Sequence, residues 1–456
     1  MTVFTNYVFF LRFFPIFLVL YYVLPRRWQN PLLFIGSLFF YSFSQIIYLP
    51  LLFGLTVLNY IFGKVLENAR RQSTQKSYQR SILAVIVVID AVALILFKVL
   101  SVSVSDIALP LGISFYIFKM ISFQADLYKE KINGKLDFFA VAAYFTMFPQ
   151  ITQGPIMRYD DQIFNKPRKF SLIRLEQGIT YFIMGMSMKV LLADRIAILW
   201  NEISKIGYES ISPALAWLGA YGYTFELYFD FWGYSLMSSG LIVMLGFPFV
   251  ENFHHPYASK NIATFYRDWH ITLGSWFRDY IYIPLGGSRE GTKKTIRNLI
   301  IVWAITGLWH GGTVNFLIWG LVLGLIIVLE RFVIKGLLEK IPLIGRLEVL
   351  VIIPLTWVIF AISDFTDMGL YFARIFPFFG IGSTARDDDF IRFFGIYWEY
   401  FAASIALLFP AVYRFFTEER QGISRFIGKS VLYGLFLVSL YFVSNTSSNP
   451  FIYFNF

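Results

Sequence analysis

Residues 298–331 read NLIIVWAITGLWHGGTVNFLIWGLVLGLIIVLER, a nearly continuous apolar stretch of 34 residues. At about 1.5 Å per residue, one helix of this length would exceed a hydrocarbon core of about 30 Å by roughly 20 Å. The stretch therefore predicts two segments, with a break at residues 309–312, where two glycines can open the backbone. Irregular backbone at membrane depth is tolerated when it lines a cavity, so we expect His310 at a cavity wall. The alternative is a hairpin turn with a structural, hydrogen-bonded histidine.

The whole composition agrees with a membrane protein. Of 456 residues, 57% are hydrophobic and only 15% are charged, whereas soluble domains carry about 25% charged residues. No polar stretch is large enough for a soluble domain, so residues 1–456 are expected to form a single transmembrane domain. The absence of cysteine excludes disulfides, thiolate nucleophiles and thiol-ligated metals. The net charge of +10 is distributed between apolar segments, which indicates membrane topology and not nucleic-acid binding.

We predict an all-α, polytopic integral membrane protein with re-entrant and interfacial helices around a central tunnel. About ten to twelve of its helices should cross the bilayer. Candidate apolar segments lie near 4–24, 31–48, 50–66, 82–100, 107–124, 138–154, 176–194, 213–231, 235–249, 296–310, 313–334, 349–363, 394–413 and 431–445. The first of them has Arg12 within it and lacks a cleavage site, so it is interpreted as a retained span and not as a signal peptide.

The charged loops predict the orientation. Residues 64–80, 158–174 and 289–297 carry five, five and four basic residues, so these loops are expected in the cytoplasm. The acidic stretch 364–392 is expected outside. Both termini then lie outside the cytoplasm, which requires an even number of crossings.

The stretch 262–287 contains too many charges for a simple span, yet it has a regular pattern. Phe265, Trp269, Trp276 and Tyr280 recur on one helical face, whereas Arg267, His270, Gly274 and Arg278 recur on the other. This pattern predicts an amphipathic helix, either re-entrant or lying at the cytoplasmic surface, which the proline and two glycines of 284–287 end. The alternative is an interfacial helix whose arginines meet lipid phosphate.

Other polar residues occur within apolar segments. Glu226 and Asp230 share a helix face, and such a pair could relay protons or bind a cation, although cross-linking of helices is the commoner role. Two prolines and a glycine interrupt the apolar run around residues 147–155. This interruption predicts a second re-entrant turn, which would bring Gln153 toward the same cavity.

At these residues the chain resembles the membrane-bound O-acyltransferase family, and within it the bacterial alginate O-acetyltransferase-like branch. The resemblance is carried by WFRDYIYIPLGG at 276–287 and LWHG at 308–311. Further matching motifs are LPLGISF at 109–115, QGPIMR at 153–158, YFDF at 228–231 and NPFIYF at 449–454. The D-alanyl transferases of teichoic acid modification share the architecture, but the IPLGG turn at 283–287 fits the polysaccharide branch better.

The resemblance implies an activity and a site. His310 matches the family's catalytic histidine and His270 its second important histidine. A histidine, with an ordinary pKa of about 6.5, suits a general base at neutral pH, and we assign that role to His310. The side chains expected to bind substrate are Arg267, Arg278, Asp279, Trp309 and Gln153.

The resemblance also implies the substrates and partners. The donor would be acetyl-CoA or an acyl carrier, with no bound cofactor and no metal, and Arg267 and the basic cluster 289–297 would hold the donor's phosphates. His270 or its neighbour Arg278 would polarise the thioester carbonyl or hold the acceptor. A bacterial cell membrane would house the chain. The acetyl group would pass to an extracytoplasmic serine-hydrolase-like acetyltransferase that modifies a polysaccharide.

Three other functions remain open at this point. The chain could transfer D-alanine to a wall polymer. It could be a proton-coupled transporter that uses Glu226 and Asp230. It could also be a scaffold without catalytic activity for a polysaccharide synthase.

Overall fold

The computed structural model describes residues 4–104, 107–379, 385–418 and 421–445. The motif at 449–454 and the C-terminus lie outside these residues, and the acidic stretch 364–392 is described only in part. Over the described ranges the chain is helical, and the only pairing of extended backbone is an isolated bridge between Phe253 and Trp269. The prediction of an all-α membrane protein is confirmed.

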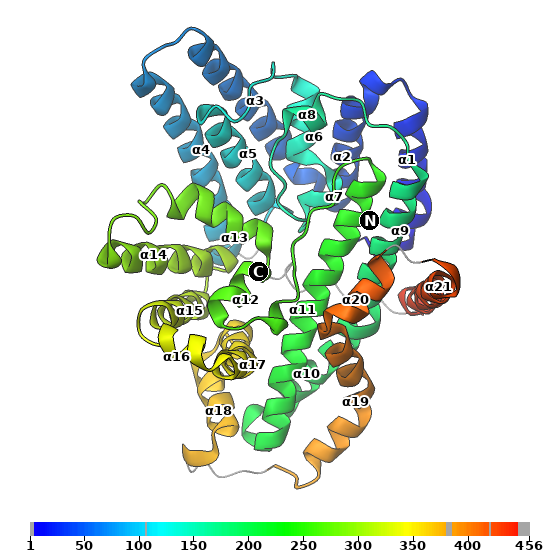
Figure 1. Ribbon diagram of the computed structural model, residues 1–456, viewed down its shortest axis with the longest axis vertical. Coiled ribbons are helices and arrows are strands. Elements are labelled where there is room, and N and C mark those ends of the chain that lie inside the picture. Colours follow the sequence, from blue (N-terminus) through cyan, green and yellow to red (C-terminus); the bar gives the residue numbers. More distant parts are fainter. Residues whose placement is uncertain (1–3, 105–106, 380–384, 419–420, 446–456) are drawn as a thin grey trace. The chain divides into compact units, whose positions relative to one another are not determined.

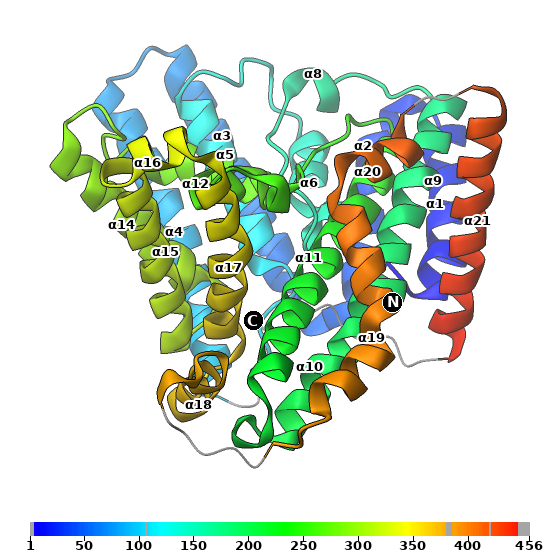
Figure 2. The same cartoon turned by 60° about the horizontal axis from the view of Figure 1, so that its bottom comes forward.

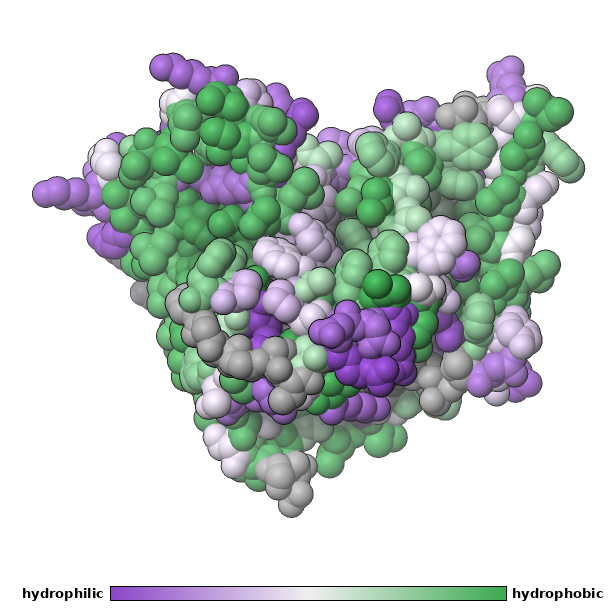
Figure 3. All heavy atoms as spheres, turned by 90° about the horizontal axis from the view of Figure 1, so that it is seen from below, coloured by the Kyte–Doolittle hydropathy of each residue, from purple (hydrophilic) through white to green (hydrophobic). Residues whose placement is uncertain are grey.

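Six helical segments in the described residues are long and apolar enough to cross a membrane. They are Arg26–Arg71, Lys76–Ser103, Val314–Phe332, Pro342–Ala361, Asp389–Leu408 and Gly422–Asn445. Shorter apolar helices cover Phe9–Val23 and Phe138–Ile151. The expected ten to twelve crossings therefore stay a prediction. Large hydrophobic side chains are exposed on these segments, and they predominate on much of the face in Figure 3, as expected for a surface that contacts lipid.

The chain divides into two compact units. The first contains Met1–Phe182 and Tyr234–Glu251, and the second contains Ile183–Gly233 and Asn252–Phe456. The predicted single domain is not tested by this division. Helix α9, Leu172–Ser187, and helix α11, Pro213–Met244, each contribute to both units (Figure 1).

The first unit is built from helices around an aromatic core. Its helices are α1 Phe14–Val23, α2 Gln29–Gln45, α3 Leu49–Arg71, α4 Lys76–Ser103, α5 Ile113–Tyr128, α6 Phe138–Thr146, α7 Phe148–Ile151 and α8 Asp161–Phe164. Phe148 lies at the centre of this core, with ring centroids 5.2 Å from Phe17 and 5.3 Å from Phe13. The predicted interruption near residues 147–155 is confirmed, because α6 ends at Thr146 and α7 is a single turn before an irregular segment.

The second unit contains the longer run of helices that follows α9. Its helices are α10 Asp194–Ile206, α12 Ile262–Asp268, α13 Ile271–Phe277, α14 Thr292–His310, α15 Val314–Phe332, α16 Lys335–Lys340, α17 Pro342–Ala361, α18 Phe365–Ile375, α19 Asp389–Leu408, α20 Pro410–Thr417 and α21 Gly422–Asn445. A π-helical turn, Met188–Ala193, joins α9 to α10, and another, Arg278–Tyr282, extends α13.

Helices α14 and α15 form the predicted pair and lie side by side (Figures 1 and 2). The first ends at His310, and the second begins four residues later, at Val314. Glycines permit the close approach of the two backbones. A Cβ atom on Gly307 would lie 2.3 Å from the carbonyl oxygen of Phe316, and one on Gly320 would lie 2.3 Å from that of Trp303. The prediction of two segments with a break after His310 is confirmed.

The carboxylate of Asp230 belongs to a buried ion cluster of the second unit. Lys189, from the π-helical turn, lies 2.7 Å from Asp230 and 2.6 Å from Asp194. The side chains of Lys189 and Asp230 are only 4% and 2% exposed. Asp230 therefore links α11 to the preceding helix, which is the commoner role considered for it from the sequence.

Candidate functional site

The single helix predicted over 262–287 is wrong in one respect. The chain leaves the helix at Trp269, which is extended, and at His270, whose φ of +46° lies in the left-handed region. Backbone hydrogen bonds from outside the helix replace those that are lost. The amide of His254 donates to the carbonyl of Asp268 at 3.0 Å, and the amide of Ile271 donates to the carbonyl of Asn252 at 2.9 Å. Because residues other than glycine seldom adopt positive φ, this contact holds His270 in a conformation that the helix would not provide.

The side chain of Asn252 determines which nitrogen of His270 carries the proton. Its Oδ1 lies 3.0 Å from Nδ1 of His270. The same oxygen accepts from the hydroxyl of Thr272 at 2.9 Å and from the backbone amide of Thr272 at 3.3 Å. A backbone amide can only donate, so the Asn252 atom facing it is the carbonyl oxygen. Nδ1 of His270 must therefore be the donor, which leaves Nε2 without a proton when the ring is neutral.

His270 is held neutral in this environment. The residue is 3% exposed, and burial lowers the pKa of its imidazole to about 3. The ring of Phe231 stands edge-on to it, with centroids 4.6 Å apart. Nε2 has no hydrogen-bond partner within the described part of the chain, and His270 lines a cavity. The imidazole thus offers a bare acceptor nitrogen.

His310 ends α14 and lies among aromatic rings. It is 6% exposed, and its ring is perpendicular to that of Trp319, with centroids 5.0 Å apart. Phe360 contacts it at 5.3 Å and Trp309 at 4.6 Å. These contacts fix the plane of the imidazole. His310 lines the same cavity as His270.

The shared cavity has a volume of about 1080 Å³ and is formed by residues of the second unit. This size suits a small-molecule site. Aromatic side chains form much of its wall, namely Tyr266, Trp269, Phe277, Tyr282, Trp303 and Trp319. Five cationic side chains also line it, namely Lys260, Arg267, Arg278, Arg331 and Lys335. The cavity therefore combines two imidazoles, aromatic surfaces and positive charge. A passage from one membrane face to the other stays a prediction.

The predicted substrate-binding residues fall into three groups. Arg267 and Arg278 line the cavity. Asp279 and Trp309 lie beside it without belonging to its wall, since Asp279 pairs with Arg278 at 2.8 Å and Trp309 packs on His310. Gln153 is a buried residue of the first unit and is not a wall residue of this cavity. The roles of all five residues stay predictions.

The predicted phosphate cluster does not contribute to this wall. Among the described wall residues none comes from 289–297; Lys294 pairs with Glu290 at 2.5 Å, and Arg297 bonds to its neighbour Asn298. Their place is taken by Lys260, Arg331 and Lys335, which the sequence reasoning missed. Arg331 and Lys335 follow a long apolar run and are four residues apart. This spacing could have indicated from the sequence that the two cations lie on one side of the chain.

Glu330 is a further residue that the sequence reasoning missed. It is 3% exposed, and its carboxylate accepts from the backbone amides of Ile262 at 2.6 Å and Ala263 at 2.9 Å. These amides are the free donors of the first turn of α12, so Glu330 caps that helix from α15. The side chain of Asn261 caps the third amide, that of Thr264, at 2.8 Å. The cap anchors the short helix that leads to His270.

A comparison with known proteins assigns this arrangement to a family. The sequence profile of the membrane-bound O-acyltransferase family matches residues 33–363, which include both histidines. The chain belongs to the membrane-bound O-acyltransferase family. The resemblance noted from the motifs is confirmed, and the chain is an acyltransferase embedded in a membrane.

Relatives within the family indicate which acyl group is transferred. A probable alginate O-acetylase of Pseudomonas syringae is 37% identical, over 82% of this chain and 75% of its own. A peptidoglycan O-acetyltransferase of Helicobacter pylori is 31% identical, over 72% of this chain and 70% of its own. A teichoic acid D-alanyltransferase of Bacillus subtilis is 29% identical, but over only 46% of this chain and 56% of its own. The chain is accordingly an O-acetyltransferase of this family.

Proposed function

We propose that the chain takes an acetyl group from cytosolic acetyl-CoA and passes it across the bacterial cell membrane for O-acetylation of an extracellular polysaccharide. The observation that carries the proposal is the cavity that His270 and His310 share with aromatic and cationic side chains. The names of the alginate and peptidoglycan relatives support a polysaccharide as the final acceptor. By the charges of its loops, the chain has both termini outside the cytoplasm.

The reaction needs a base and a place for the developing negative charge. His310 removes the proton from the acceptor hydroxyl as its oxygen attacks the thioester carbonyl carbon. The tetrahedral intermediate collapses, the carbon–sulfur bond breaks, and the leaving thiolate takes up the proton that His310 carries, which regenerates the base. The guanidinium of Arg278, at the cavity wall, stabilises the oxyanion.

The two functions considered for His270 are not equally compatible with its environment. Polarising the thioester carbonyl would require a donor nitrogen facing the cavity. The proton of the neutral ring is instead on Nδ1 and is directed to Asn252. Nε2 can only accept a hydrogen bond. We therefore assign His270 to holding the acceptor by accepting a hydrogen bond from a group other than the reacting hydroxyl, because the single proton of that hydroxyl goes to His310.

The donor is recognised by charge and by aromatic surface. Lys260, Arg267, Arg331 and Lys335 in the wall suit the phosphates of CoA. The wall tryptophans suit its adenine and its apolar arm. Neither feature distinguishes free acetyl-CoA from a phosphopantetheine arm on a carrier, so the choice of acetyl-CoA rests on the family resemblance.

The acceptor hydroxyl is expected to belong to a partner. The family resemblance favours an extracytoplasmic serine-hydrolase-like acetyltransferase, which would then modify the polysaccharide. The D-alanyl alternative differs only in the acyl group and its carrier, and the lower coverage of the D-alanyl relative supports the acetyl reading.

The test measures the release of CoA from acetyl-CoA by the purified chain with its partner or a polysaccharide acceptor. We expect His310→Ala and His270→Ala each to lose most of the turnover. His254→Ala is the matched control, because that histidine is 66% exposed and is not a wall residue. Unchanged turnover in both site variants would overturn the proposal. Turnover of a D-alanyl carrier thioester, with none of acetyl-CoA, would replace it with the D-alanyl alternative.

A further inference from the structure

A second cavity, of about 560 Å³, lies in the first unit and is unrelated to the histidine site. It is formed by the segment that runs from α8 into α9 and by Gly246 and Pro248. Four of its described wall residues are cationic, namely Lys166, Arg168, Lys169 and Arg174, and none is acidic. The predicted function makes no use of this cluster.

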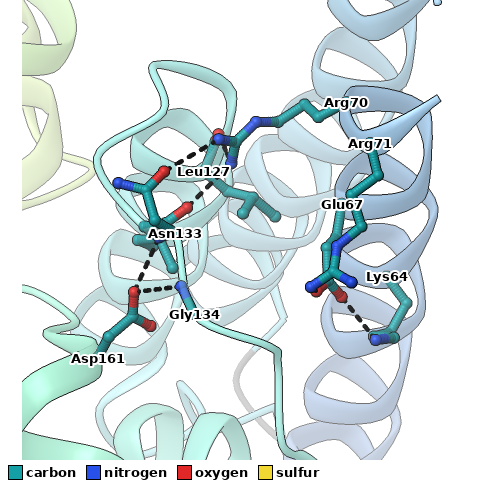
Figure 4. Close-up of polar contacts among 9 residues, drawn as sticks. Lys64, Glu67, Arg70, Arg71, Leu127, Asn133, Gly134 and Asp161 are labelled. Atoms are coloured by element: carbon teal, nitrogen blue, oxygen red, sulfur yellow. Dashed lines mark hydrogen bonds and ion pairs between the residues drawn. The ribbon is translucent and has the colours of Figure 1, made fainter. Parts of the chain in front are cut away.

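The four cations are not neutralised by protein carboxylates. None of them belongs to an ion pair found between described residues. The two acids just before them in the chain are engaged by amides: Asp160 accepts from Gln162 at 2.7 Å, and Asp161 accepts from Asn133 and Gly134 at 2.8 Å each (Figure 4). Like charges around one small space repel each other, so the cavity favours an anion.

The arginine in this wall is held in place before any ligand arrives. Arg168 is 6% exposed. Its guanidinium donates to the hydroxyl of Tyr21 and to Oδ1 of Asn30, each at 2.5 Å, and to the carbonyl of Ile163 at 3.0 Å. The side chain of Gln29 also bonds to its backbone amide and carbonyl, at 2.9 Å and 2.8 Å. Three of the five donors of the guanidinium are thus used for positioning, and two stay available.

A second arginine and the two lysines complete the basic wall. Arg174 donates from Nη1 to the carbonyl of Gly246 at 2.6 Å. Lys166 donates a hydrogen bond to the neutral side-chain amide of Gln162, at 2.7 Å, and Lys169 is exposed. The wall therefore combines two oriented guanidinium groups with two ammonium groups at an open edge. This combination suits a phosphate group.

Exposed apolar side chains lie next to the cations along the chain. Phe170 is 51% exposed, Leu172 is 71% exposed and Ile173 is 63% exposed. They come between Lys169 and Arg174 in the chain, at the beginning of α9. A free phosphate or a soluble phosphate ester would have no use for such a flank, whereas a phospholipid would cover it with its acyl chains. The loop was also predicted to lie at the cytoplasmic face, where anionic lipids are enriched.

We propose that this basic cavity binds the phosphate headgroup of an anionic phospholipid, with the acyl chains against Phe170, Leu172 and Ile173. The lipid would tie the beginning of α9 to the cytoplasmic leaflet. A phosphodiester is the chemistry recognised, and a phosphatidylglycerol-type lipid is its source. The inference does not depend on the acetyl-transfer proposal.

The experiment measures lipid binding to the purified full chain by native mass spectrometry from detergent. Phosphatidylglycerol is compared with phosphatidylcholine, and the variant is Lys166→Ala/Lys169→Ala. Each lysine near a lipid phosphate contributes roughly a fivefold change in affinity, so we expect about a tenfold or larger loss of phosphatidylglycerol binding and no change for phosphatidylcholine. Both lysines are exposed, so their replacement should not unfold the chain. A thermal melt checks that the variant is folded.

The matched control is Lys76→Ala/Lys131→Ala. It removes the same charge from two exposed lysines that already face carboxylates, Glu130 at 2.7 Å and Asp126 at 3.1 Å. An equal loss of phosphatidylglycerol binding in the control would mean that the loss comes from the lower net charge of the protein, and it would overturn the proposal. So would competition by inorganic phosphate or glycerol phosphate at the same concentration as the lipid, since the ligand would then be a free anion. Binding of an acidic carrier protein that needs these lysines, with lipid binding unchanged, would also overturn it.

Discussion

The two basic cavities of this chain contain similar cations but differ in what accompanies them. The cavity of the first unit has four cations in its described wall and no histidine or acid. The cavity of the second unit has five cations, and beside them His270, His310 and the acids Glu330 and Glu339. Its aromatic wall is also larger. One cavity can attract an anion, whereas the other can attract an anion and move a proton.

The difference shows that positive charge alone is not a sign of catalysis. Exposed lysines and arginines bind phosphate at little cost because water still solvates them. Chemistry also needs a base at the same place, and an imidazole, with an ordinary pKa of about 6.5, supplies one at neutral pH. In this chain only the second cavity, among those described, has both. Four predictions test the contrast.

The largest expected effect is on His310. The variant His310→Ala removes the proposed base, and we expect acetyl-CoA turnover to fall by about 10²- to 10⁴-fold. The lysine variant of the first cavity, Lys166→Ala/Lys169→Ala, should leave turnover in detergent within about twofold, since it changes no wall residue of the histidine site. A comparable loss in both variants would contradict the functional separation of the two cavities.

The next effect concerns the partner of His270. Replacing Asn252 by Leu removes the acceptor that fixes the tautomer, and we expect turnover to fall about 10- to 100-fold. Asn252→Asp keeps the acceptor but adds a negative charge that favours the protonated imidazole. At high pH its rate should therefore approach that of the wild type. As the pH is lowered, its rate should begin to fall at a higher pH than the wild-type rate does. Identical pH profiles for Asn252→Asp and wild type would mean that His270 does not titrate in this position.

A third prediction concerns stability against pH. His270 has a folded pKa of about 3, below the ordinary value of about 6.5 in the unfolded chain. The unfolded state therefore binds the extra proton first, and stability is lost as the pH falls below 6.5. Between pH 7.5 and pH 5 the protonation of this residue in the unfolded chain should lower the free energy of unfolding by about 2 kcal/mol. Thermal melts of wild type and His270→Gln at several pH values measure this loss. The same dependence of the melting temperature on pH in both proteins would exclude the effect.

The smallest expected effect is on the cap of α12. In Glu330→Gln one of the two carboxylate oxygens is replaced by an NH₂ group. The buried backbone amide of Ile262 or Ala263 then has no acceptor. We expect a loss of about 1 kcal/mol in stability and a higher KM for acetyl-CoA with a nearly unchanged kcat, because α12 carries Arg267 into the cavity wall. The control is Glu290→Gln, an exposed glutamate paired with Lys294. A fall in kcat alone would contradict the proposed anchoring role.

Much of the fold was predictable because it depends on properties that act along the chain. The fraction of apolar residues and the length of the runs identify an all-helical membrane protein, since a bilayer sets both the hydropathy and the length of a span. The hairpin of α14 and α15 follows from the same arithmetic, because a largely apolar stretch of 34 residues is too long for one crossing. The motifs around His270 and His310 also identified the family before any geometry was known.

The remainder depended on residues that are distant in sequence. The break at His270 and its tautomer come from Asn252, which is 18 positions earlier, and the cap of α12 comes from Glu330, which is 68 positions beyond Ile262. Helical periodicity contains no information on such contacts, since it describes only which neighbours along one helix share a face. For the same reason the sequence did not show that Lys260, Arg331 and Lys335 line the cavity whereas the cluster 289–297 does not. The sequence by itself determined the class of protein, the hairpin and the two motifs that contain the histidines. The tertiary structure decided which cations share a cavity with the histidines and which nitrogen of His270 carries the proton, because both depend on contacts between residues that are distant in sequence.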